Sequence, residues 1–285
     1  MDAAAPEQGM IAQPPPLSPP ASSSRAMLAA ADLRETMRRW RVWGRIGWQD
    51  IRMRYRRSII GPFWLTLSMA VMVTALGVLY AQLLRITIRD YLPFLTLGLL
   101  AWGLISGLLN DGGQAFIGAA AFIRQVRMPH AFHALRSVWR NFLIFAHNIV
   151  VFVGVALVFQ IWPSPATLLV IPGLVLLLLN GVWATLLLGM ICLRFRDAPQ
   201  IITSLLQVVF FVTPVLWKPE LLEGRRYAFV ALNPFYHFVE LVRAPLLGHA
   251  PALETWLATG AIGVLGWAVT FVFFSRYRHR IPYWV

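Results

Sequence analysis

Six long apolar runs restrict what this chain can fold into. They cover residues 63–84, 91–110, 141–162, 166–193, 201–217 and 254–274. At about 1.5 Å per helical residue, most of these runs can cross the roughly 30 Å of hydrocarbon in a bilayer. The run 201–217 is the weakest candidate, because it is short and contains Pro214. Since 58% of the residues are hydrophobic and 13% are charged, the sequence predicts an all-α integral membrane protein with six transmembrane helices.

The basic residues indicate the orientation of these spans. The formal net charge is +13. If the amino terminus lies in the cytoplasm, 19 of the 25 lysine and arginine residues fall in cytoplasmic segments. This asymmetry predicts a multi-pass protein of the plasma (inner) membrane with both termini cytoplasmic and an even number of spans. Because the arginines flank apolar runs, we expect them to meet membrane lipids and not nucleic acid. The single cysteine, Cys192, excludes an intrachain disulfide and forms no metal-ligand cluster.

The first part of the chain divides into a tail and an amphipathic segment. Residues 1–31 are rich in proline and serine, which predicts a disordered cytoplasmic tail. Asp32 and Glu35 have capping-box spacing, so we expect a helix to begin at Asp32. Apolar and arginine stripes then continue through residues 32–60, and we expect Gly44 and Gly47 to bend or split this helix. The remainder, residues 61–285, is the predicted six-span domain.

The amphipathic segment favours a helix that lies in the membrane interface, because tryptophans recur on its apolar stripe beside the arginines. The alternative is a surface helix packed on a soluble domain, but no such domain remains in the sequence. Its basic end is expected to bind lipid head groups through Arg52, Arg54, Tyr55, Arg56 and Arg57. A role of these arginines in topology and head-group binding is favoured over direct substrate contact.

The segment 227–248 is apolar but is interrupted by Pro234 and Pro245. It is therefore too broken to span the bilayer, and we expect a re-entrant or interfacial hairpin between spans five and six.

The sequence lacks groups with which this chain could supply its own energy. Its only lysine, Lys218, lies between Trp217 and Pro219, outside any glycine-rich P-loop. All twelve carboxylates lie outside the six runs or at their margins, whereas ion-coupled carriers usually place ionisable groups in mid-membrane. His147, beside Asn148, is the one titratable residue well inside a run, and a packed role is favoured over a proton relay. These features favour a pore-forming subunit that receives energy from another protein.

An enzyme and a passive channel are the alternatives from other classes. A basic cluster on the predicted inner side could bind phosphate, as in polytopic membrane transferases: Arg124, Arg127, His130, His133 and Arg136. The nearest acid is Asp111, and neither a carboxylate pair nor a metal-spaced ligand set accompanies the cluster. General acid–base chemistry would lack its partner, so we predict no catalytic residue.

Three tryptophans, Trp102, Trp183 and Trp267, fall near the middle of their runs, where anchoring at the membrane interface does not explain them. They could line a glycan path by stacking on sugar rings, or they could pack between helices. The sequence leaves both interpretations open.

Four stretches together resemble the permease subunits of ABC-type polysaccharide exporters. The first is Arg52-Met53-Arg54-Tyr55-Arg56-Arg57-Ser58-Ile59-Ile60-Gly61-Pro62-Phe63-Trp64, in which Ile60 stands where the family usually has Leu. The second is Tyr91-Leu92-Pro93-Phe94 with Gly98, Trp102 and Ser106. The third is Phe122-Ile123-Arg124-Gln125-Val126-Arg127-Met128-Pro129, with Gln125 where a second basic residue is common. The fourth runs from Asn233-Pro234-Phe235-Tyr236 to Arg243-Ala244-Pro245-Leu246-Leu247-Gly248. The resemblance covers about residues 40–275.

This resemblance implies a homodimer that works with separate ATPase subunits, which would hold ATP and Mg, so no cofactor is expected in this chain. It implies export of a lipid-linked (undecaprenyl-type) polysaccharide, such as O-antigen, capsule or teichoic acid. The loop 122–129 would be the element that couples to the ATPase, and the segment 233–248 the extracellular re-entrant element. Export of another amphiphile, such as a lipid or a drug, is the alternative within the same class.

Overall fold

The computed structural model describes residues 24–54, 61, 63–221 and 227–285, and no strand occurs among them. Five described helical segments are long and apolar enough to cross a membrane, which confirms the predicted all-helical, multi-pass character. The long helices are α3 (Phe63–Leu83), α4 (Ile88–Gln114), α6 (Ala131–Phe159), α7 (Val170–Arg194) and α11 (Leu253–Tyr277). The 3₁₀ turn η1 (Pro165–Leu169) leads directly into α7.

The predicted span at 201–217 is only partly helical. The helix α8 (Ala198–Val212) has 15 residues, which corresponds to about 22 Å at about 1.5 Å per residue. It ends because Thr213 is extended, the conformation that a following proline favours. A sixth crossing therefore stays a prediction, since α8 alone is shorter than the bilayer core.

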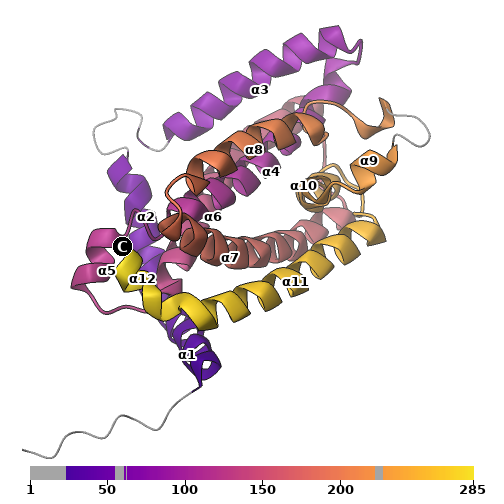
Figure 1. Ribbon diagram of the computed structural model, residues 1–285. Coiled ribbons are helices and arrows are strands. Elements are labelled where there is room, and N and C mark those ends of the chain that lie inside the picture. Colours follow the sequence, from indigo (N-terminus) through magenta and orange to yellow (C-terminus); the bar gives the residue numbers. More distant parts are fainter. Residues whose placement is uncertain (1–23, 55–60, 62, 222–226) are drawn as a thin grey trace, which may run out of the picture.

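The short elements gather at the two ends of the bundle (Figure 1). One end carries α1 (Arg25–Arg38), α2 (Trp40–Arg54), α5 (Ala120–Gln125), η4 (Arg278–Arg280) and α12 (Ile281–Trp284). The opposite end carries η2 (Pro219–Leu221), α9 (Tyr227–Ala231) and α10 (Pro234–Leu246). The described amino-terminal and carboxy-terminal segments thus lie at the same end.

The helix α4 forms the centre of the bundle and is the most buried of the long helices. It contacts α3, α6, α7, α8 and α10, and its residues Leu97, Leu100 and Leu104 are almost inaccessible. By contrast, α3 and α8 each leave at least half of their apolar side chains exposed, including Val71, Leu205 and Phe211. In a membrane protein such faces meet lipid or another protein.

The amino-terminal helix differs from the prediction. It begins at Arg25, where Ser24 Oγ accepts a hydrogen bond from the Met27 N–H at 3.2 Å, and not at Asp32. It also ends at Arg38, so that the predicted single helix is two helices separated at Arg39. The break is stabilised from α2, because the Trp43 indole N–H donates to the Thr36 carbonyl at 3.1 Å. Carbonyls at a helix end need such partners.

Gly44 and Gly47 do not split the helix, because α2 is continuous through both. Instead, Gly47 lets α2 lie close to α6. A Cβ atom at Gly47 would be 3.0 Å from Trp139 Cδ1 and 3.3 Å from the Arg136 carbonyl oxygen. The absence of a side chain therefore serves packing here.

Candidate functional site

The predicted coupling loop, residues 122–129, combines a packed side with an exposed side. Phe122 lies edge-on to His133, with ring centroids 5.7 Å apart, and Ile123 packs against the cluster around Phe116. Met128 Sδ accepts a hydrogen bond from Arg39 Nη1 at 3.1 Å. Pro129 precedes α6, and its carbonyl accepts from the Phe132 N–H at 3.2 Å. These contacts hold the loop against α1 and α6.

The other side of this loop is exposed, and its exposed residues are Arg124, Gln125, Val126 and Arg127. The Arg124 guanidinium donates to the backbone carbonyl of Val285. Arg124 also lines a cavity of about 550 Å³ together with Arg196, Gln200 and Trp284. The loop thus presents positive charge at the end of the bundle that carries both described termini.

Asp32 has a role that sequence reasoning missed. Its carboxylate accepts hydrogen bonds from the backbone N–H groups of His130 and Ala131, each at 3.0 Å, so it caps α6 and not its own helix. The Arg278 guanidinium lies 3.9 Å away. Burial lowers the pKa of His130, since the charged imidazole would lose water, while Asp32 raises and Arg278 lowers it. Helix α1 and the carboxy-terminal segment therefore meet at the start of α6.

A second ionic cluster joins α2, α4 and α6. Asp50 accepts from Nε and Nη2 of Arg136 at 2.7 and 2.5 Å. Arg140 Nη2 donates to Asp111 at 2.8 Å, and the Asn141 amide donates to the same carboxylate oxygen at 3.0 Å. From the sequence, Asp111 was identified only as the acid nearest to the basic cluster, and Asp50 was assigned no role. Both acids are far from Arg136 and Arg140 in the sequence, so no local pattern indicated these ion pairs.

The predicted lipid-binding residues are only partly described. Arg52 is exposed on α2, and Arg54 ends that helix. Tyr55, Arg56 and Arg57 lie outside the described residues. Near them, α1 and α2 expose both apolar and basic side chains, namely Met37, Trp40, Arg34, Arg38, Arg41 and Arg45.

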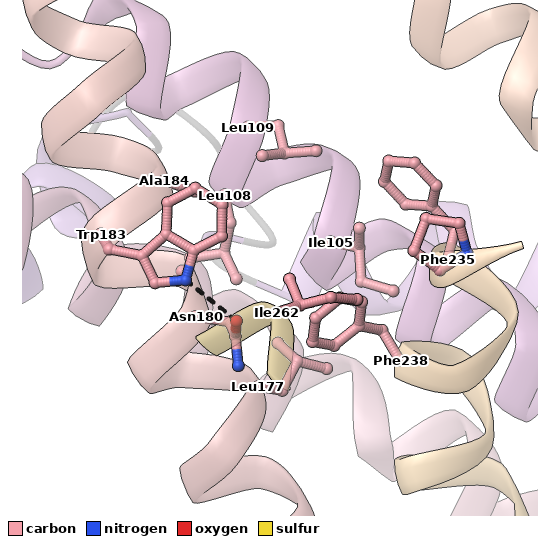
Figure 2. A pocket seen from close by; sticks show the side chains of 12 residues that line it. Ile105, Leu108, Leu109, Leu177, Asn180, Trp183, Ala184, Phe235, Phe238 and Ile262 are labelled. Atoms are coloured by element: carbon pink, nitrogen blue, oxygen red, sulfur yellow. Dashed lines mark hydrogen bonds between the residues drawn. The ribbon is translucent and has the colours of Figure 1, made fainter. Parts of the chain in front are cut away.

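An apolar cavity of about 180 Å³ lies between α4, α7, α10 and α11 (Figure 2). Its lining includes Ile105, Leu109, Phe235, Phe238 and Trp183. Asn180 contributes a polar side chain to this lining, and its Oδ1 accepts a hydrogen bond from Trp183 Nε1 at 2.9 Å (Figure 2). The cavity therefore suits an apolar group, because its main polar group is already paired.

The structure does not bring the three central tryptophans together. Trp102 is buried, with its ring 5.5 Å from that of Phe210 and 5.9 Å from that of Phe235. Trp183 lies at the apolar cavity and also packs against Gly266, where a Cβ atom would collide with its ring. Trp267 is half-buried against a different cluster, which contains Met190. Of the three, Trp183 lines the apolar cavity and is half-buried.

The predicted re-entrant segment forms α9 and α10. The Asn233 side chain caps α10 by accepting from the Phe235 N–H at 2.9 Å, and Pro234 occupies the first helical turn, where a missing N–H costs nothing. Tyr236 lies beside His237, with ring centroids 5.4 Å apart. At the other end, Pro245 lies in the last turn, and Gly248 has φ +91°, which glycine adopts without strain.

Arg243 is the most unexpected residue of this segment, because it is only 1% exposed. Its guanidinium pairs with Glu240 on the same helix, and Nη1 donates to the Pro214 carbonyl at 2.8 Å. The same group lies 4.0 Å above the Phe94 ring. A Cβ atom at Gly98 would be 3.4 Å from Nη1 and 2.9 Å from the Val215 carbonyl oxygen. Arg243 therefore joins α10 to α4 and to the turn after α8.

Among the described residues, no group of three or more His, Cys, Asp or Glu side chains could hold a metal ion. The arrangement instead offers a charged end, a bundle of apolar helices and an internal apolar cavity. These features are those of a membrane transport subunit.

Comparison with known families bears this out. Residues 41–247 match the model of the ABC-2 type transporter family, and the chain belongs to that family. This confirms the resemblance to ABC exporter permeases inferred from the four sequence stretches. The matched region includes α2, the loop 122–129 and α10.

Curated relatives carry a more specific name. The O-antigen export system permease protein RfbA of Myxococcus xanthus is 28% identical over 233 residues, covering 80% of this chain and 89% of that protein. A protein of the same name from Klebsiella pneumoniae is 22% identical over 239 residues, covering 81% of this chain and 90% of that protein. A second Klebsiella pneumoniae protein of that name is 23% identical over 189 residues, covering 65% and 72%.

Proposed function

We propose that this chain is the transmembrane subunit of an ATP-driven exporter that moves a lipid-linked polysaccharide, such as O-antigen, across the plasma membrane. The observation that carries this proposal is the similarity to O-antigen export permeases along about four-fifths of the chain. The apolar bundle and the basic loop at one end are what such a subunit requires. The names of the relatives favour an export permease over a transferase.

The proposed topology has six crossings and both termini in the cytoplasm. Helix α8 runs back from the end that carries α5 toward the end that carries α10, and the turn 213–216 extends its path (Figure 1). The positive-inside asymmetry supports a cytoplasmic position for the end with α1, α5 and α12. Helix α10 would then be the re-entrant element on the outer side.

Energy would come from a separate ATPase that holds ATP and Mg. The exposed positive side of the loop 122–129, with Arg124 and Arg127, is the proposed docking surface. Charge complementarity at such a surface fixes orientation and suppresses wrong partners. The packed side of the loop would pass a displacement of the ATPase to α1 and α6.

The pair α1–α2 is proposed to lie in the membrane interface. Exposed Trp40 and Met37 would enter the acyl boundary while the exposed arginines meet lipid head groups. The apolar exposed faces of α3 and α8 are the proposed contacts with a second copy, which would complete a homodimeric channel. Trp183 is the tryptophan best placed to contact a passing glycan, since it lies at a cavity.

The test is export in cells of the native host. Loss of this chain should remove O-antigen from the surface and leave lipid-linked glycan at the cytoplasmic face, and re-expression should restore export. Unchanged surface glycan, with accumulation of a drug or a plain lipid, would favour the alternative amphiphile exporter. A glycan of altered composition at unchanged amount would favour a transferase.

A further inference from the structure

A small polar cavity lies beside the ionic cluster, apart from the apolar cavity described above. It measures about 150 Å³ and lies between α4, the turn that leads to α5, and the first turns of α6. Its polar lining is Asp111, Gln114, His133, Arg136, Ser137 and Arg140. The cavity therefore has charged walls at the same end of the bundle as the loop 122–129.

Three polar atoms of this lining have no hydrogen-bond partner in the described part of the chain. They are His133 Nδ1, Ser137 Oγ and Arg140 Nε. His133 is 3% exposed and Ser137 is 4% exposed, so bulk water does not reach them. The three residues are spaced at intervals of four and three on one face of α6. Since buried polar groups almost always have partners, this alignment indicates a ligand that supplies them.

The unpaired atoms indicate the chemistry of that ligand. Arg140 Nε is a donor, the Ser137 hydroxyl can donate, and His133 Nδ1 can donate in one tautomer. Three donors on one wall, one of them on a guanidinium, suit an oxyanion, which accepts several charge-assisted hydrogen bonds at once. The volume is sufficient for more than one water-sized group.

The neighbouring charges leave Arg140 able to take an anion. Asp50 is occupied by the two hydrogen bonds from Arg136, and Arg140 lies farther from it, at 3.7 Å. The close acid partner of Arg140 is Asp111, whose side chain is 31% exposed and can turn toward solvent. An entering anion can therefore replace Asp111 on the guanidinium.

We propose that this cavity binds one phosphate group, held by Arg140, Ser137 and His133 in exchange for Asp111. Such a group is carried by free pyrophosphate and by the diphosphate of a lipid carrier. Assignment to the lipid carrier rests on the proposed function, whereas the oxyanion site does not. Unlike the interfacial arginines of α2, this site lies inside the protein, next to the loop that is proposed to meet the ATPase.

The test uses the full chain purified in dodecyl maltoside, with radiolabelled inorganic pyrophosphate in equilibrium dialysis. Saturable binding is expected, and Arg140→Gln and Ser137→Ala should each weaken it about tenfold or more, as loss of a charge-assisted or buried hydrogen bond does. Asp111→Asn should tighten it, because the competing carboxylate is gone. Arg194→Gln and Ser275→Ala, which change the same residue types outside the cavity, should bind as the wild type does.

The opposite signs separate a binding role from structural damage, which would weaken binding in all three cavity variants. Ser137→Ala should leave thermal unfolding unchanged, since its hydroxyl has no partner to lose. Absence of saturable binding, or equal binding by every variant, would show that the cavity holds water only and would overturn the proposal.

Undecaprenyl diphosphate and uncharged undecaprenol, added as competitors, distinguish the two sources. Displacement of pyrophosphate by the diphosphate lipid alone supports a lipid head group, and failure of both to displace it removes the link to the lipid substrate. A chain that exports glycan without binding pyrophosphate overturns this inference alone. A chain that binds pyrophosphate without exporting glycan overturns only the proposed function.

Discussion

The carboxylate of Asp50 on α2 and the guanidinium of Arg136 on α6 form a two-bond ion pair, with distances of 2.7 and 2.5 Å. The two side chains are 10% and 26% exposed, so the pair is largely removed from water. It fixes α2 against α6 at a point beside the phosphate cavity proposed above. The packing of Gly47 on Trp139 supports the same contact.

Asp50→Asn should loosen this contact. The loss of one charge leaves Arg136 with a weaker partner, and we expect a destabilisation of about 1–3 kcal/mol. Thermal unfolding in detergent measures the effect, and limited proteolysis reports on release of α1 and α2. Glu35→Gln is the matched control, because its pair with Arg39 is exposed and should contribute little. Equal effects of both substitutions would contradict a special role of Asp50.

The double substitution Arg124→Glu and Arg127→Glu should abolish export while the permease still accumulates in the membrane. Both side chains are exposed on the loop 122–129, so the fold should tolerate them, whereas a negative surface would lose its partner. Co-purification of the ATPase and glycan at the cell surface are the two readouts. Arg276→Glu is a control for an exposed arginine outside the loop. Normal ATPase capture by the double variant would exclude this surface.

The topology can be checked by single-cysteine labelling in a Cys192→Ser background. His279→Cys should react with a membrane-impermeant maleimide only after the cytoplasmic side is opened, and His249→Cys should react from outside. Both positions are exposed, so failure to label would not arise from burial. Labelling of residue 279 from outside would contradict the proposed cytoplasmic carboxy-terminal segment.

Trp183→Leu and Trp102→Leu should separate a glycan contact from packing. Trp102 lies between Phe210 and Phe235, so its loss should lower the abundance of the protein in the membrane and export together. Trp183 borders a cavity, so its replacement should reduce export more than abundance. Stacking of a nucleic-acid base on an aromatic side chain contributes roughly 1–3 kcal/mol, and a sugar ring should contribute an amount at the low end of this range. Trp267→Leu is the third comparison. If Trp183→Leu exports normally, this residue is not on the path.

Gly98→Ala should destabilise the protein, because its Cβ atom would lie 2.9 Å from a backbone oxygen of Val215 that cannot move aside easily. Overpacking of this kind typically costs about 1–3 kcal/mol. Gly260→Ala is the control, since nothing lies within 4 Å of its added Cβ atom. Thermal unfolding of both variants in detergent is the measurement. A wild-type midpoint for Gly98→Ala would mean that α4 and the turn after α8 are less tightly packed than described.

Much of the helical architecture could be predicted, because the length of an apolar run is a local property of a sequence. The long helices α3, α4, α6, α7 and α11 belong to this class, whereas the run predicted as a span over 201–217 is helical only as far as Val212. Partners distant in sequence could not be predicted. Asp32 seemed to begin its own helix, yet its carboxylate caps α6 at Ala131.

The candidate sites follow the same division. The loop 122–129 was recognisable as a sequence motif, and the structure shows that its residues Arg124 and Arg127 are exposed. Arg243 is buried, and its partners are Glu240, the Pro214 carbonyl in the turn after α8 and the Phe94 ring on α4, a set that no local sequence pattern indicates. The polar cavity had no sequence signal, since its walls combine residues of α4 and α6 that only the fold brings together.

The surroundings of Arg243 also bear on how the chain is made. Its partners Phe94 and Pro214 precede it in the chain, so both are synthesised before the arginine that contacts them. Glu240 lies three positions earlier on the same helix and pairs with Arg243. This pairing reduces the large cost of burying an isolated ion. A chain in which α4 followed α10 would synthesise Arg243 before the Phe94 ring that it contacts, so the order of the helices in the gene is itself suited to assembly.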